Sequence, residues 1–131
     1  MDILLIDQES EVLDLLENLI RFASPEGNGW SIQKTNKPED AVQLALQNGF
    51  DLVVMDPRFS EKWGLPLIKT IREVRPRTTV IVLCNCGSDL CSLYCRDRYR
   101  EFGVNHHVDK TKGLLGIPGM VRDCQRNAAV C

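Results

Sequence analysis

Three short apolar runs constrain the fold of this chain more than any other feature. Each run contains four consecutive aliphatic residues and no charge. The runs are Ile3–Ile6, Leu52–Met55 and Val80–Leu83. They are followed by Asp7, Asp56 and Cys84, respectively. Short uninterrupted runs of this kind are typical of strands buried on both faces of a sheet.

Two further segments have the alternating pattern of half-exposed strands. Trp30 and Ile32 lie on either side of one serine, and Val104 and Val108 lie on either side of a polar triplet. Alternation places one face toward a core and the other toward solvent. We therefore expect these two strands at the edges of the sheet and the three apolar runs at its centre.

Helical patterns separate the strands. The expected helices are Ser10–Ile20, Lys37–Asn48, Pro66–Val74, Ser88–Phe102 and a segment from about Pro118 through Cys124. Ser10 and Ser88 are predicted N-caps, and Gly103 follows the fourth helix. Strand–helix alternation predicts an α/β fold with right-handed crossovers. The expected architecture is a flavodoxin-like three-layer sandwich, whose parallel sheet has the order 2-1-3-4-5 with helices on both faces.

Length and composition indicate one globular domain, residues 1–131. Hydrophobic residues make up 44% of the chain and charged residues 26%, which excludes a disordered chain. The sequence holds no stretch of 18 uncharged apolar residues, so we expect no membrane span. Asp2 stands where a signal peptide would be basic, so we expect a cytoplasmic protein with mostly reduced cysteines. The spacing of the cysteines argues against a structural zinc site.

Charged and polar residues follow the predicted strands. In a parallel α/β sheet, ligands bind at the carboxyl ends of the strands. Asp7, Asp56, Cys84 and Lys110 occupy those positions. Carboxylates bind Mg²⁺, and a lysine can contact phosphoryl oxygens. Asp56 is therefore predicted to be a carboxylate nucleophile that forms an acyl phosphate.

At these residues the sequence resembles the receiver domain of two-component response regulators, the family of the chemotaxis receiver. The resemblance extends over about residues 2–127. Residues 3–9 (ILLIDQE) resemble the first strand and acidic pair, and residues 51–57 (DLVVMDP) the phosphoacceptor strand. Gly64 stands where the family has a glycine, and residues 102–110 (FGVNHHVDK) resemble the segment that leads to the invariant lysine.

The resemblance implies a phosphoacceptor rather than a turnover enzyme. A sensor histidine kinase or a phosphotransfer protein would phosphorylate Asp56. The implied Mg²⁺ ligands are Asp7, Asp56, Gln8 and the backbone carbonyl of Arg58.

The resemblance also implies a switch, in which Cys84, Lys110 and His107 respond to the phosphoryl group. The signal would leave through the face formed by the fourth helix, the fifth strand and the fifth helix. A downstream protein or output domain would bind there, and the same face could form a homodimer.

Four positions depart from the family pattern. Gln8 replaces an acid, Cys84 a serine or threonine, His107 an aromatic residue, and Thr111 a proline. An amide brings no charge to a metal, and a thiol is a weak donor. These departures favour a weakened metal site, and they leave a second hypothesis open: a degenerate receiver that acts as a phosphorylation-independent protein-interaction module.

Other interpretations of the same residues are simpler. Cys84 could be a small buried hydrophobe, and His107 an edge histidine or a pH sensor. Arginines in the fourth helix could indicate nucleic acid, but Asp97 and Glu101 interrupt them, so direct nucleic-acid binding is disfavoured. An enzyme on this fold is disfavoured too, because no glycine-rich phosphate loop follows a strand.

Overall fold

The computed structural model describes residues 1–23, 30–59, 64–85, 97 and 99–130. Five parallel strands form one sheet in the order β2-β1-β3-β4-β5. The strands are β1 (Asp2–Ile6), β2 (Ser31–Thr35), β3 (Leu52–Met55), β4 (Thr79–Cys84) and β5 (His106–Asp109). This confirms the predicted fold class and strand order.

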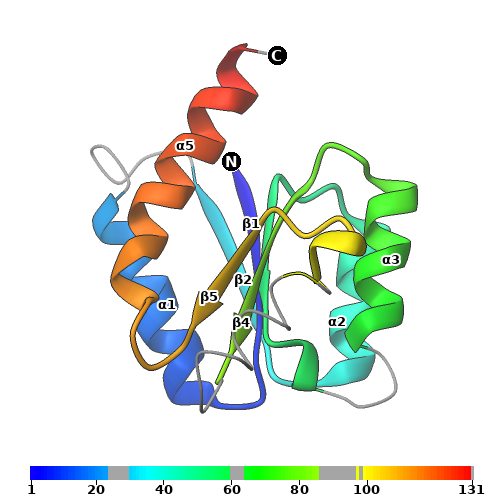
Figure 1. The fold of residues 1–131 in the computed structure, drawn as a ribbon, viewed down its shortest axis with the longest axis horizontal. Coiled ribbons are helices and arrows are strands. Elements are labelled where there is room, and N and C mark those ends of the chain that lie inside the picture. Colours follow the sequence, from blue (N-terminus) through cyan, green and yellow to red (C-terminus); the bar gives the residue numbers. More distant parts are fainter. Residues whose placement is uncertain (24–29, 60–63, 86–96, 98, 131) are drawn as a thin grey trace.

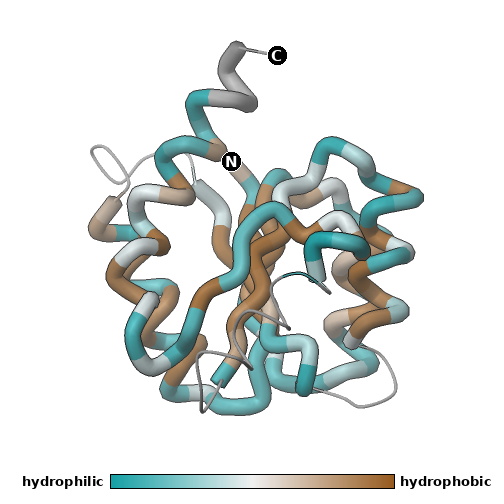
Figure 2. The backbone as a smooth tube through the Cα atoms, in the orientation of Figure 1, coloured by the Kyte–Doolittle hydropathy of each residue, from teal (hydrophilic) through white to brown (hydrophobic). Residues whose placement is uncertain are grey.

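Helices cover both faces of the sheet (Figure 1). They are α1 (Ser10–Ala23), α2 (Pro38–Gln47), α3 (Gly64–Val74) and α5 (Ile117–Val130). Ile3 and Leu5 of β1 belong to the core beneath α1 and α5. Leu4 and Ile6 belong to the second core, beneath α2 and α3. Successive residues of a strand point to opposite faces, so an uninterrupted apolar strand supplies apolar side chains to both cores. Figure 2 shows the inner strands as the most hydrophobic part of the chain.

The edge strands differ slightly from their predicted positions. β2 begins one residue after Trp30, and β5 begins at His106 rather than Val104. Val104 belongs instead to the end of the preceding helix, because its N–H donates to the carbonyl of Tyr99 at 3.2 Å. Both edge strands keep the expected half-exposed pattern.

The predicted fourth helix is described only at its end. Its predicted start at Ser88 and the cysteines Cys91 and Cys95 lie outside the described residues, whereas residues 99–101 are helical. Gly103 has a φ of 87°, the left-handed conformation that commonly ends a helix. The predicted helix end at Gly103 is therefore confirmed, and this segment is called the fourth helix below.

The predicted N-cap at Ser10 was wrong. Ser10 is the first residue of α1, and its hydroxyl accepts a hydrogen bond from Asn36 Nδ2 at 3.3 Å instead of capping the helix. α5 starts at Ile117, which confirms the predicted start near Pro118 to within one residue, and it contains Gly119. A glycine inside a helix costs only about 1 kcal/mol, which the burial of Ile117 and Val121 offsets.

The ends of the strands define two opposite edges of the molecule. The start of β1 and the end of α5 lie at one edge, and the carboxyl ends of the strands lie at the other (Figure 1). Within the described ranges, no helix is both long and apolar enough to cross a membrane.

Candidate functional site

The backbone places three charged residues at the carboxyl edge of the sheet. Each follows a strand and donates its N–H to the neighbouring strand or its extension. The N–H of Asp7 donates to Thr35 O at 3.3 Å, and that of Asp56 to Ile6 O at 3.0 Å. The N–H of Lys110 donates to Cys84 O at 2.8 Å. The sheet register therefore fixes where the three side chains begin.

The side chain of Lys110 joins the two carboxylates. Its Nζ lies 2.7 Å from Asp7 Oδ2 and 2.8 Å from Asp56 Oδ2. The contact with Asp56 also has hydrogen-bond geometry, whereas the buried Asp7 Oδ2 is compensated by the charge of the ammonium. Asp7 is only 1% exposed, and the side chain of Asp56 is 14% exposed. The predicted site residues Asp7, Asp56 and Lys110 thus form one acidic pocket.

The remaining carboxylate oxygens bind backbone N–H groups two residues further along the chain. Asp7 Oδ1 accepts from the N–H of Glu9 at 2.9 Å. Asp56 Oδ1 accepts from the N–H of Arg58 at 2.8 Å. The sequence analysis missed both donors, although an aspartate before a turn commonly bonds the backbone in this way. Together with Lys110, these bonds fix the orientation of both carboxylates.

Lys110 remains charged throughout the ordinary pH range. Burial lowers the pKa of its ammonium, but the hydrogen bond to Asp56 and the contacts with Asp7 outweigh burial, so the pKa is raised above 10.5. With two carboxylates and one ammonium, the pocket has a net charge of −1.

The oxygen atoms of this pocket could coordinate a divalent cation, but only two of the side chains that offer them are charged. Asp7 and Asp56 offer the hard carboxylate oxygens that Mg²⁺ prefers. Gln8, which is exposed, adds only a neutral amide. Among the residues that the structure describes, no group of three or more His, Cys, Asp or Glu side chains is suited to a metal ion. Asp7 and Asp56 thus offer two oxygen ligands of the kind that Mg²⁺ prefers, and Mg²⁺ binding here stays a prediction.

Arg58 and Cys84 lie at the rim of this pocket by sequence position. Arg58 is in the one-turn 3₁₀ helix Pro57–Phe59, and its side chain is exposed. Cys84 is buried at the end of β4. Of the described cysteines, Cys124 is free and Cys84 is disulfide-bonded. Cys84 is therefore an exception to the expectation of mostly reduced cysteines, and a disulfide sulfur has no S–H to donate.

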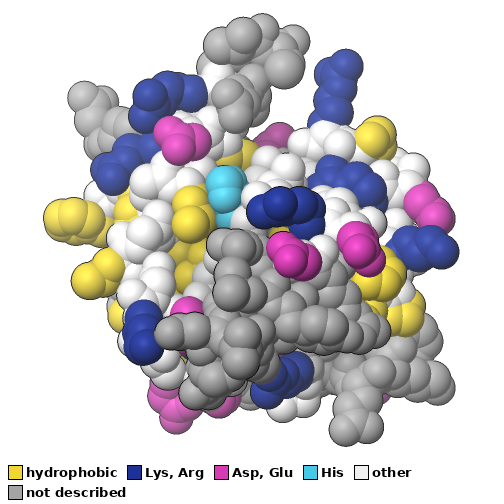
Figure 3. Space-filling model, in the orientation of Figure 1, with side chains coloured by type: hydrophobic (Ala, Val, Ile, Leu, Met, Phe, Trp, Pro, Cys, Tyr) yellow, Lys and Arg dark blue, Asp and Glu magenta, His cyan; other side chains and the backbone are white. Residues whose placement is uncertain are grey.

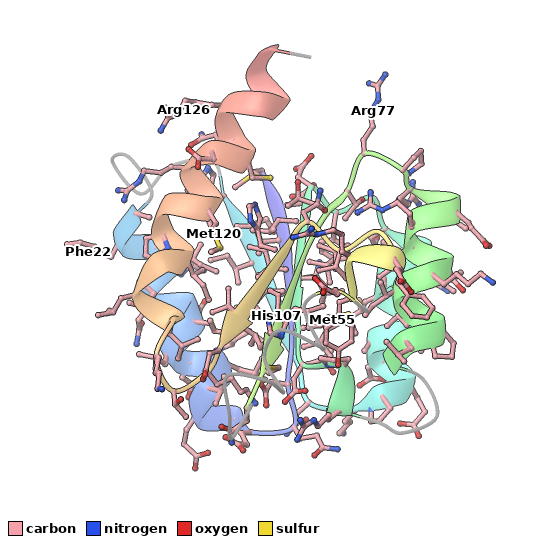
Figure 4. All side chains as sticks on the ribbon, viewed as in Figure 1. Phe22, Met55, Arg77, His107, Met120 and Arg126 are labelled. Atoms are coloured by element: carbon pink, nitrogen blue, oxygen red, sulfur yellow. The ribbon has the colours of Figure 1, made fainter. Side chains whose placement is uncertain are left out.

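His107 lies on β5, three residues before Lys110, and is partly buried (Figure 4). Its ring packs against that of Tyr99 from the fourth helix, with centroids 5.7 Å apart and an interplanar angle of 31°. The sequence analysis did not identify this pair. Through it, the strand that carries Lys110 is in direct contact with the fourth helix.

Thr111 changes the turn after Lys110. Its N–H and hydroxyl both donate to Asp109 Oδ1, at 2.8 and 2.7 Å. These bonds lower the pKa of Asp109. A proline at this position has neither donor, so the departure noted in the sequence adds two hydrogen bonds to the turn.

Gly64 lies against the loop that follows Asp56. A Cβ atom on Gly64 would be 1.9 Å from the carbonyl oxygen of Pro57. Such an approach is possible only for a residue without a side chain. The glycine noted in the sequence therefore has a steric reason here: it lets the start of α3 pack against Pro57, the residue after Asp56.

Comparison with known proteins identifies one matching family. The family described as "Response regulator receiver domain" matches residues 3–112. The transcriptional regulatory protein CpxR of Escherichia coli K12 is 32% identical over 67% of this chain and 35% of that protein. ZraR of the same strain is 28% identical over 63% of this chain and 18% of that protein. The chain thus spans only a minor part of these relatives.

Solved structures share the fold. The signal receiver domain of a DNA-binding response regulator from Colwellia psychrerythraea superposes with a TM-score of 0.80 and 18% identity, over 96% of this chain and 98% of that one. A two-component response regulator from Clostridium difficile superposes with a TM-score of 0.73 and 22% identity, over 96% of both chains.

Proposed function

The chain belongs to the response regulator receiver domain family, and on this basis we propose that Asp56 accepts a phosphoryl group from a phosphohistidine of a sensor kinase or phosphotransfer protein. An Asp56 oxygen attacks phosphorus, so that a P–O bond forms while the P–N bond breaks. The histidine keeps the electron pair and takes up a proton. The observation that supports this most directly is the Asp56 carboxylate at a strand end, 2.8 Å from Lys110.

The residues of the pocket have separate roles in this proposal. Arg58 N–H and Lys110 orient the Asp56 carboxylate, and Lys110 binds the oxygens of the transferred group. Asp7 holds Lys110 in place. Asp7 and Asp56, with the Gln8 amide and the Arg58 carbonyl, would hold Mg²⁺. When bound, the ion would neutralise negative charge on the incoming phosphoryl group.

Phosphorylation changes what Lys110 contacts. Asp56 gains negative charge and three oxygens, so Lys110 has stronger partners than in the unphosphorylated pocket. Because Lys110 continues from β5, its displacement is passed to His107 and from there to Tyr99. We propose that this shifts the population of two arrangements of the output face, defined as residues 99–101, β5 and α5. Cys84 can contribute a contact only when it is reduced.

The partners in this scheme are a phosphodonor on one side and a downstream protein or output domain on the other. A second copy of the chain at the output face, and the cytoplasmic location, stay predictions. The chain acts as a phosphoacceptor and not as a turnover enzyme in this proposal.

Intact-mass measurement tests the assignment of Asp56. The chain is incubated with MgCl₂ and acetyl phosphate in reducing buffer, and we expect one phosphoryl adduct. The adduct should be absent in Asp56→Asn and present in Asp40→Asn, which alters an exposed carboxylate in α2. An adduct that persists in Asp56→Asn contradicts the proposal.

A second function is favoured by one specific observation. Lys110 already compensates both carboxylates, and Gln8 brings no third charge, so the pocket is stable without a metal or a phosphoryl group. This describes a receiver that binds its partner without phosphorylation. The absence of any adduct on the parent chain supports this second function.

Substituting Gln8 with aspartate is expected to strengthen Mg²⁺ binding about tenfold or more, because it adds a unit charge beside two existing carboxylates. Titration calorimetry with MgCl₂ measures the affinity. The control is Gln43→Asp, which places the same charge on the exposed side of α2. Equal affinity in the parent and in Gln8→Asp would show that residue 8 does not face the ion.

A further inference from the structure

The output face contains a small polar hollow. It has a volume of about 250 Å³ and lies where the fourth helix, β5 and α5 meet. Its lining residues are Arg100, Val104, Asn105, His106, His107 and Met120. Figure 3 shows histidine atoms on this face beside a patch of hydrophobic atoms, with basic side chains nearby.

The polar groups in the hollow are mainly hydrogen-bond donors. The exposed guanidinium of Arg100 has no partner among the described residues, and neither has the exposed imidazole of His106. None of the described residues that line the hollow carries a carboxylate. An arginine without a carboxylate partner favours an anionic guest, since a charged hydrogen bond is stronger than a neutral one.

Asn105 adds a donor whose orientation is fixed from behind. Its Oδ1 accepts from Arg72 Nη2 at 2.9 Å and from the N–H of Val80 at 2.8 Å. With the oxygen held there, the amide NH₂ is the group left for a guest. The NH₂ has no partner among the residues described, so it is available to an incoming acceptor.

Arg72 holds this arrangement by a set of hydrogen bonds from α3. Its Nε and Nη2 donate to Gly103 O at 3.1 and 2.8 Å, and its Nη1 donates to Pro76 O at 2.6 Å. The guanidinium therefore joins the end of α3, the end of the fourth helix and the start of β5. This rigid support prepares Asn105 for binding at little entropic cost.

We propose that the hollow binds an acidic side chain of a downstream protein, with an adjacent apolar residue of the same segment packing on Met120 and Val104. The proposal deepens the proposed function, because it names the chemistry of the partner at the output face. The hollow can hold a carboxylate and part of a neighbouring side chain. Its lining offers hydrogen-bond donors to the carboxylate and apolar surface to the neighbouring side chain.

Flanking charges favour a segment with a single carboxylate over nucleic acid. Asp97 and Glu101 are exposed on the fourth helix, and Asp123 is exposed on α5. A nucleic-acid backbone carries regularly spaced phosphates and would meet these carboxylates. A single carboxylate side chain can enter the hollow without approaching them.

A titration monitored by ¹⁵N NMR tests the proposal on the unphosphorylated chain. The probe is a synthetic acetylated and amidated pentapeptide of sequence Ser-Glu-Leu-Ser-Gly, and its neutral analogue is Ser-Gln-Leu-Ser-Gly. We expect the acidic probe to bind with a Kd of about 1 mM or lower. Shifts should centre on the Asn105 side-chain NH₂ and the amides of His106 and Met120, and the neutral analogue should produce none.

Variants identify the groups involved. Arg100→Glu should weaken the binding of the acidic probe at least about tenfold. Asn105→Asp keeps an acceptor for Arg72 and Val80 but puts a negative charge in place of the NH₂, and it should also weaken binding. Arg77→Glu makes the same charge change at an exposed site away from this face (Figure 4), and it should leave the affinity unchanged.

Three results would overturn the proposal. They are the absence of shifts at Asn105 and His106, equal binding of both peptides, and equal loss of affinity in Arg77→Glu and Arg100→Glu. Binding of a dT oligonucleotide that depends on Arg100 would replace the acidic segment by nucleic acid. Because the titration uses no phosphodonor, its failure is distinct from the loss of the Asp56 adduct.

Discussion

Replacing Lys110 with methionine is expected to lower the free energy of unfolding at pH 7 by about 3–5 kcal/mol. The ammonium is the shared partner of two carboxylates, at 2.7 and 2.8 Å, and one of them is almost fully buried. Methionine fills a similar volume but leaves Asp7 and Asp56 without a cation. Urea denaturation of the parent and the variant measures the difference.

The effect of Lys110→Met should depend on pH. In the parent, the pKa of Lys110 is raised, because its bonds to Asp56 and Asp7 outweigh burial. Its stabilisation is therefore fully present below pH 10.5 and is lost as the pH rises through the raised value.

Lys112→Met is the control for this prediction. Lys112 is exposed two residues further along the chain, and it should change stability by less than about 0.5 kcal/mol. Equal effects of the two variants at pH 7 would contradict the role assigned to Lys110. So would a Lys110→Met deficit that stays the same as the pH rises above 10.5, where Lys110 of the parent loses its charge.

Substituting Gly64 with alanine is expected to destabilise the fold by about 3 kcal/mol or more. The added Cβ would lie 1.9 Å from the carbonyl oxygen and 2.8 Å from the carbonyl carbon of Pro57. These are backbone atoms, so no rotamer change can relieve the clash. Pro57 directly follows Asp56, and its displacement should also disturb the contact between Asp56 and Lys110.

Gly119→Ala provides the matched control, because a Cβ at Gly119 meets no atom within 4 Å. In the interior of α5 this change should stabilise the protein by about 0.5–1 kcal/mol. In thermal and urea unfolding, the change in the free energy of unfolding relative to the parent should be negative for Gly64→Ala and positive for Gly119→Ala. A neutral effect of Gly64→Ala would mean that Pro57 moves freely and that the close approach is not required.

The sequence predicted those features that depend on neighbouring residues along the chain. The uninterrupted runs at Ile3–Ile6 and Leu52–Met55 have no polar face, so only the centre of a covered sheet suits them. Because strand ends in a parallel sheet share one edge, the positions of Asp7, Asp56 and Lys110 followed from the fold itself. The element boundaries were less accurate. Val104 is a residue type common in strands, but its N–H bonds the end of the fourth helix and β5 begins only at His106.

Features that depend on distant residues could not be predicted. Arg72 and Asn105 are 33 residues apart, and nothing in either local sequence indicates that their side chains meet. The pairing of Tyr99 with His107 depends on how the fourth helix packs. The disulfide at Cys84 depends on the distance between sulfur atoms, whereas the N-terminal sequence, unlike a signal peptide, suggested mostly reduced thiols.

Both ends of the described chain lie far from the chemistry proposed here. The start of β1 and the end of α5 share the edge of the molecule opposite the acidic pocket (Figure 1). A reporter protein or a surface tether attached at either end would therefore leave the pocket facing the bulk solution. The transfer of a phosphoryl group from different phosphodonors to the anchored protein could then be compared, because the attachment would not shield Asp56.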